Sequence, residues 1–162
     1  MTVGGPFLFG KLPMHGDFVC RGMRPVQRSA WDVRCTATLA DARMRLGDAY
    51  EASLEAVAPR GFLLAPTDAE PFWQTGVAAP SCDRAGRLFL LVLGMMSEGG
   101  WGEGAPAVAA LLQPCLRMAI AEGADADTLI ARMEDAAEAG VPDAVAMMMG
   151  WRTDWIEAAV RP

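Results

Sequence analysis

The sequence has little with which to bind a metal ion, because its 162 residues include one histidine and four cysteines. The cysteines stand at positions 20, 35, 82 and 115, and no two of them have the C-x-x-C spacing that is typical of zinc and redox sites. We therefore expect four free thiols with structural roles, no metal and no other cofactor.

Long apolar runs are also missing. The longest is Leu88–Met96, which Gly94 interrupts, whereas a membrane-spanning helix needs about 20 apolar residues. The first six residues, MTVGGP, have neither the basic region nor the apolar stretch of a secretory signal. We expect a cytoplasmic protein without membrane insertion.

Common catalytic patterns are absent as well. The sequence contains no G-x-S-x-G, no H-E-x-x-H and no phosphate-binding G-x-x-x-x-G-K-[ST] motif, and the glycines between positions 99 and 104 are interpreted as a loop. We expect a protein that is not an enzyme and has no catalytic residues. The alternative is a small hydrolase in which His15, the only histidine, acts as a base beside Asp17.

The charge is unevenly distributed along the chain. The net charge is −6, yet residues 11–45 contain seven basic and three acidic residues, a net +4 that leaves −10 elsewhere. A basic face on an acidic body either steers an acidic protein partner or is a solvated helix surface. Nucleic acid is disfavoured, because the sequence pI is about 4.7 and the arginines are not interleaved with stacking aromatic residues.

Hydrophobic patterning predicts an α+β single domain over residues 1–162. Leu88–Leu93 is continuously apolar, as in a central strand covered on both faces, and a turn at Asp83–Gly86 makes its pairing antiparallel. We therefore predict a mostly antiparallel sheet with helices on both faces. The expected strands are Phe7–Lys11, Phe62–Ala65, Gly76–Ala79 and Leu88–Leu93. The expected helices are Ser29–Val57, Pro106–Glu122, Asp127–Ala139 and Pro142–Val160. We expect Gly47 to split the first helix and Pro114 to kink or break the second.

Two segments combine glycine, proline and charge in an unusual way. Residues 8–21 read LFGKLPMHGDFVCR, and residues 80–89 read PSCDRAGRLF. We predict that the two segments meet in space and that their charged residues either bind a partner or form internal ion pairs. Asp17 is expected to accept from Arg21, from backbone amides or from Arg87, and Asp83 is expected to close its own turn through its side chain or to pair with Arg87. Because loss of Asp17 would orphan an arginine, Asp17→Ala is expected to destabilise the fold. The six candidate binding residues are Lys11, Asp17, Arg21, Asp83, Arg84 and Arg87.

Helix ends and the C-terminal region give further expectations. Ser29 with Asp32 resembles a capping box, and Asp125 or Asp127 is suited to cap the helix that ends at Ala139. The methionines at 147–149, with Trp151 and Trp155, either form an adaptable docking surface or pack a last helix on the core.

Three motifs resemble, in the same order, those of the N-terminal domain of the TagF (ImpM) family of bacterial type VI secretion systems. They are Gly10–Arg21, Trp31-Asp32 and Pro80–Phe89, and the resemblance covers about residues 7–96. This resemblance implies a compact α/β/α fold and a post-translational repressor that acts by binding a forkhead-associated scaffold protein. The alternative is a structural or accessory subunit of the secretion apparatus.

Overall fold

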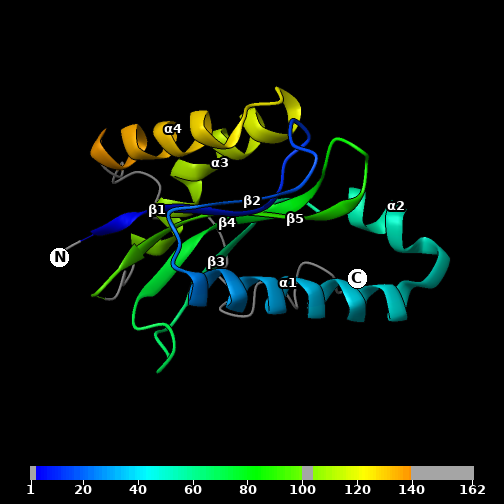
Figure 1. The fold of residues 1–162 in the computed structure, drawn as a ribbon, viewed down its shortest axis with the longest axis horizontal. Helices are drawn as coiled ribbons and strands as arrows, with labels where there is room; N and C mark the ends of the chain where they lie inside the picture. The colour runs from blue at the N-terminus through cyan, green and yellow to red at the C-terminus, as the bar shows by residue number, and fades with distance from the viewer. Residues whose placement is uncertain (1–2, 100–103, 140–162) are drawn as a thin grey trace.

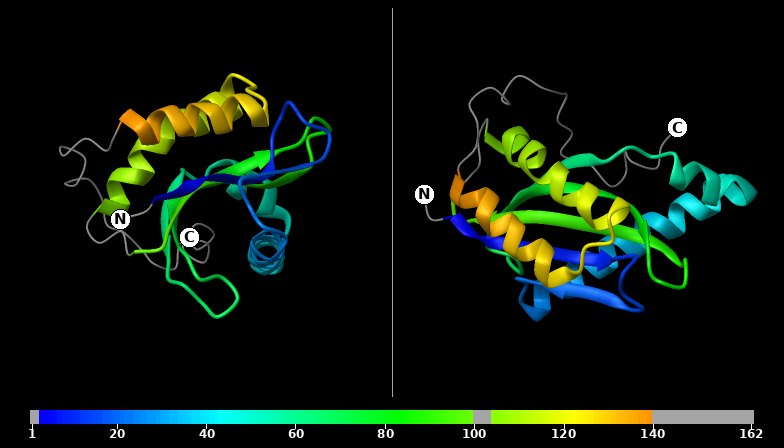
Figure 2. Two further views of the ribbon diagram at one scale, coloured as in Figure 1. Left: turned by 60° about the vertical axis from the view of Figure 1, so that its left-hand side comes forward. Right: turned by 90° about the horizontal axis from the view of Figure 1, so that it is seen from above.

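The computed structural model describes residues 3–99 and 104–139. They form a five-stranded antiparallel sheet of order β2-β1-β5-β4-β3. Helices α1 and α2 cover one face and helices α3 and α4 cover the other, as Figure 1 and the left view of Figure 2 show. The predicted α+β fold with two-sided cover is confirmed. The elements are β1 (Val3–Lys11), β2 (Phe18–Arg21), α1 (Pro25–Leu46), a 3-10 turn (Gly47–Ala49), α2 (Tyr50–Glu55), β3 (Arg60–Leu64), β4 (Trp73–Cys82), β5 (Leu88–Ser97), α3 (Ala105–Ala121) and α4 (Ala126–Ala139).

Strand β5 is central because both of its faces are apolar. Successive side chains of a strand point to opposite faces. Leu90 and Val92 accordingly belong to the core under α1, whereas Leu91, Leu93 and Met95 belong to the core under α3 and α4. The uninterrupted apolar run of this strand is therefore required by its position.

The core under α1 is aromatic and contains buried polar groups. Trp31 of α1 packs edge-on against Phe62, with ring centroids 5.1 Å apart. Its indole Nε1 donates to Gln74 Oε1 at 2.8 Å, and Gln74 Nε2 donates to the buried Glu70 carboxylate. The buried polar groups of Trp31, Gln74 and Glu70 are thus linked in one chain of hydrogen bonds.

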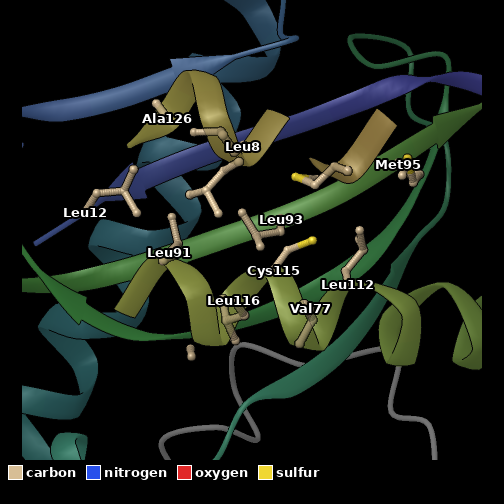
Figure 3. Close-up of a cluster of buried hydrophobic side chains, with 14 of the residues drawn as sticks. Leu8, Leu12, Val77, Leu91, Leu93, Met95, Leu112, Cys115, Leu116 and Ala126 are labelled. Atoms are coloured by element: carbon tan, nitrogen blue, oxygen red, sulfur yellow. The ribbon is translucent and has the colours of Figure 1, made fainter. Parts of the chain in front are cut away.

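The core under α3 and α4 is aliphatic. Figure 3 shows Leu8, Leu91 and Leu93 of the sheet facing Leu112 and Leu116 of α3. Cys115 is buried in this layer, and α3 does not end at Pro114, so the predicted break does not occur. Gly123, with a φ of 67°, follows the helix in a conformation that glycine adopts at low cost.

Several boundaries differ from the sequence predictions. Helix α1 begins at Pro25, since proline suits the first helical position, and Gln27 Oε1 accepts from the backbone N–H of Arg24 at 3.0 Å. The capping box predicted at Ser29 and Asp32 is therefore wrong. The predicted split at Gly47 is confirmed, with a φ of 52° there. Strand β2 was not predicted as a strand. The predicted helix Pro142–Val160 and the Met and Trp residues within it lie outside the described residues.

Candidate functional site

The turn between β4 and β5 is built around the Asp83 side chain. Gly86 donates its N–H to the Asp83 carbonyl at 2.9 Å, which closes the predicted turn. Asp83 Oδ1 accepts from the backbone N–H groups of Ala85 and Arg87, each at 3.0 Å. One carboxylate oxygen is thus used entirely to fix the local backbone.

The second oxygen of Asp83 joins this turn to the end of β1. Asp83 Oδ2 accepts from Lys11 Nζ at 3.0 Å and from Arg87 Nε at 2.7 Å, and both Lys11 and Asp83 are buried. Burial alone would raise the pKa of Asp83. The Arg87 backbone N–H and the Lys11 and Arg87 side chains donate to the carboxylate and hold its pKa well below the ordinary value. The carboxylate is therefore charged and fully paired.

The β1–β2 loop is attached to the same turn through its backbone carbonyls. Arg84 donates its backbone N–H to the His15 carbonyl at 2.8 Å and its Nη2 to the Met14 carbonyl at 2.6 Å. Arg87 Nη2 donates to the Gly16 carbonyl at 3.0 Å. The two loops lie side by side at one end of the sheet (Figures 1 and 2), so the prediction that the two unusual segments meet is confirmed.

Asp17 is not part of this network. It is exposed, and its one hydrogen bond among the described residues comes from the adjacent Phe18 N–H at 3.1 Å. Its predicted pairings with Arg21 and Arg87 are wrong, whereas the predicted alternative, in which Asp17 accepts from a backbone amide, is confirmed. Because Phe18–Arg21 is a strand, positions 17 and 21 are separated by roughly 13 Å.

Arg21 and His15 instead contact α4, which sequence reasoning missed. Arg21 Nε donates to Asp127 Oδ1 at 2.7 Å, and His15 Nε2 accepts from the backbone N–H of Ala126 at 3.2 Å. Asp125 caps the same helix by accepting from the Thr128 N–H, and this hydrogen bond lowers the pKa of Asp125. Of these three contacts with α4, only the Asp125 cap was predicted from the sequence. The proton-accepting nitrogen of His15 is thus occupied in a structural contact.

The outer surface of the two joined loops combines apolar and basic groups. Met14 and Phe18 are 47% and 41% exposed. The Phe18 ring packs edge-on against Phe89 with centroids 4.8 Å apart, which fixes its position. Arg84 and Arg87 are exposed beside them. We call the surface of Met14, Phe18, Arg84 and Arg87 the loop platform.

The family model for the TagF N-terminal domain, described as type VI secretion system-associated, matches residues 7–141. The chain belongs to the TagF family. The match extends well beyond the region in which the motifs are visible by eye, and it includes α3 and α4.

A solved structure has the same fold as this TagF domain. PA0076 from Pseudomonas aeruginosa PAO1 superposes with a TM-score of 0.66 at 24% sequence identity, over 85% of this chain. The matched region is 63% of the length of PA0076, so the chain spans less than two thirds of that protein. A comparison with curated proteins gives no match.

Three further observations concern metal-binding groups, thiols and membrane-spanning helices in the described part of the TagF domain. No group of three or more His, Cys, Asp or Glu side chains is placed to hold a metal ion in ranges 3–99 and 104–139. The four cysteines are free, and burial raises the pKa of the Cys35 thiol to about 12. No helix in the described part of the chain has the length and apolar character needed to cross a bilayer.

Proposed function

We propose that this TagF chain, as one domain over residues 1–162, is a non-enzymatic cytoplasmic regulator that represses type VI secretion by binding a forkhead-associated scaffold protein. Membership of the TagF family supports the link to type VI secretion. The repressor role and the scaffold partner come from what the motifs at Gly10–Arg21 and Pro80–Phe89 imply.

The loop platform is the observation that carries the proposal. Its backbone is held by the buried Lys11–Asp83 pair and by three hydrogen bonds to carbonyls 14–16. A surface that is rigid before binding loses little conformational entropy when a partner docks. Exposed Met, Phe and Arg side chains are also the types enriched at protein interfaces.

The six candidate residues therefore have different roles in this proposal. Lys11 and Asp83 are buried and act by shaping the platform. Arg84 and Arg87 present exposed guanidinium groups to the partner. Asp17 lies exposed at the rim, and Arg21 ties β2 to α4. The basic groups of the platform suit an acidic patch on the scaffold.

Secretion by a deletion strain tests the regulatory role. Deletion of a repressor raises secretion, whereas deletion of a structural subunit stops it. We expect secretion to rise and the unaltered chain to restore repression. A fall in secretion would overturn the proposal in favour of an apparatus subunit.

Binding of the purified scaffold tests the platform. Arg84→Glu reverses a charge on the platform and is expected to weaken binding by about ten-fold. Arg132→Glu is the matched control, because Arg132 is an exposed arginine on α4. Equal binding by both variants would show that the platform is not the docking site.

A further inference from the structure

A surface pocket of about 400 Å³ lies where the first turn of α1 meets the start of β1 and the end of β5. Its volume is near the lower end of the range of roughly 300–1,000 Å³ that is typical of small-molecule sites. Gly4 and Met96, which line the pocket, are paired in the sheet, whereas Lys11 stands at the far end of β1. Positions 4 and 11 of this strand are separated by roughly 20 Å. The pocket is therefore at the opposite end of the sheet from the loop platform (Figure 1).

The walls of the pocket are apolar. Met23, Phe72 and Met96 line it. Methionine is unbranched and adapts to apolar groups of irregular shape, and a phenylalanine ring offers a flat surface on which a second ring or an alkyl chain packs. These walls suit the apolar body of a ligand.

Arg24 supplies the positive charge of the pocket. Its guanidinium carbon lies 5.3 Å from the centre of the Phe72 ring, which holds the cation beside the apolar walls. Arg24 takes part in none of the ion pairs among the described residues. The acidic residues nearest in sequence to the walls are Glu70 and Glu98, and neither lines the pocket. Glu70 is buried and accepts from Gln74. The charge of Arg24 is thus available to an anionic group.

Gln27 supplies a second polar group, which has a poor partner. It is 1% exposed and lines the pocket. Its Oε1 accepts from the Arg24 backbone N–H, and its Nε2 donates to the Met96 sulfur at 2.7 Å. A thioether sulfur is a weak acceptor, so a carboxylate oxygen would be a stronger partner for this amide. The first turn of α1 also contains no acidic residue, so the positive end of the helix dipole favours a ligand of the same negative charge.

We propose that this pocket binds a small carboxylic acid with an apolar body, such as an aryl- or alkyl-substituted propanoic acid. The apolar body packs among Met23, Phe72 and Met96, and the carboxylate accepts from Arg24 and Gln27. One cation suits one negative charge, and a planar guanidinium donates to a planar carboxylate through two parallel hydrogen bonds. The site is additional to the proposed repressor role and does not depend on it.

Titration of the purified full chain with matched probes tests the site. The probes are 3-phenylpropanoate and its uncharged amide, and backbone chemical shifts in NMR spectra report the dissociation constant of each. We expect the acid to bind about ten-fold more tightly than the amide, because only the acid forms charge-assisted hydrogen bonds. Raised salt is expected to weaken the acid and not the amide. The largest shifts are expected at the start of α1 and at Phe72.

Two variants separate the contributions of the charge and of the walls. Arg24→Gln is expected to weaken the acid about ten-fold and to leave the amide unchanged. Phe72→Ala removes a wall and is expected to weaken both probes. Arg28→Gln is the matched control, because Arg28 is an exposed arginine one turn further along α1 and does not line the pocket. The melting temperature of each variant shows whether its fold is retained.

Each other outcome overturns the proposal. Equal binding of acid and amide, or equal losses in Arg24→Gln and Arg28→Gln, would show that Arg24 does not hold a carboxylate. No binding up to about 10 mM would show that the pocket is not a ligand site. N-acetylphenylalanine mimics the last residue of a protein chain, and much tighter binding of this probe would assign the pocket to a partner's C-terminus. These titrations use the purified chain, so the site can fail while deletion still raises secretion, and the repressor role can fail while the acid still binds.

Discussion

Two ion pairs in this TagF domain join segments that are far apart in sequence, and they differ in burial more than in length. Lys11 Nζ lies 3.0 Å from Asp83, and Arg21 Nε lies 2.7 Å from Asp127. The first pair is buried, whereas the side chains of the second are 40% and 80% exposed. Distance alone would rank the second pair higher. Burial reverses the ranking, because water competes for exposed charges and not for buried ones.

The partners of each carboxylate explain the difference further. Asp83 accepts four hydrogen bonds, from two backbone N–H groups and from the Lys11 and Arg87 side chains. Removing one partner leaves a buried charge under-satisfied. The Asp127 carboxylate is open to water, which replaces Arg21 when that side chain is lost. The buried pair therefore shapes the loop platform, and the exposed pair only adds to the contact between β2 and α4.

Of the substitutions that compare the two ion pairs, replacement of Lys11 is expected to lower the stability of the fold most. Lys11→Met keeps the length of the side chain and removes its charge, which leaves Asp83 without one of its two cationic partners. The melting temperature is expected to fall by about 10 °C.

Arg21→Met is the matched control for Lys11→Met, because it removes one charge of the exposed pair. Its melting temperature is expected to fall by no more than about 2 °C. Thermal unfolding followed by circular dichroism measures both variants. Equal shifts would contradict the ranking by burial.

Acid titration separates the contribution of Asp83 from the rest of the fold. Its pKa in the folded chain lies below 3.8, the ordinary aspartate value, because donors surround the charged form. The folded state therefore binds the proton less readily than the unfolded chain does. The stabilisation is complete above about pH 4 and is lost as the pH falls toward the folded pKa.

The measurement compares denaturant unfolding of the unaltered chain and of Asp83→Asn at stepped pH. The difference in free energy of unfolding is expected to be constant between about pH 5 and pH 7 and to narrow below about pH 4. Asp125 also titrates in acid with a lowered pKa, but it is present in both proteins and cancels in the difference. A pH-independent difference would show that Asp83 acts through packing alone.

The contrast between the two ion pairs also shows which contacts can be predicted from the sequence and which cannot. The Asp83–Gly86 turn and the central strand at Leu88–Leu93 were predictable, since each depends on neighbouring residues or on one uninterrupted pattern. That the two charged segments meet was also predictable, because both flank strands of one small sheet.

The missed contacts depend on packing between distant elements. Arg21 and Asp127 are 106 positions apart, and the position of α4 over β2 decides that they pair. His15 reaches Ala126 for the same reason. Strand β2 was missed because its four residues flank a loop and only Val19 is fully buried. No local pattern specifies such pairings, whereas the cap at Asp125 is local and was found.

A double-mutant cycle on Arg21 and Asp127 measures the exposed pair directly. The coupling energy between Arg21→Ala and Asp127→Ala is expected to be about 0.5 kcal/mol and to decrease as salt is raised. Arg21 also donates to the Cys20 carbonyl, and the cycle cancels that contribution. A coupling of several kcal/mol that is insensitive to salt would mean that this pair is desolvated in solution.

Asp17 provides the smallest expected effect on stability and the sharpest test of function. The sequence prediction was that Asp17→Ala destabilises the fold by orphaning an arginine. In the structure, Arg21 pairs with Asp127 and Arg87 pairs with Asp83, so no arginine loses its partner. We expect a change of less than about 0.5 kcal/mol in the free energy of unfolding and a coupling energy between Asp17 and Arg87 near zero.

Denaturant unfolding of Asp17→Ala checks the change in the free energy of unfolding, and a double-mutant cycle on Asp17 and Arg87 checks the coupling energy. Loss of scaffold binding in a variant of unchanged stability would then assign Asp17 to the partner interface, since no structural role is left to explain it.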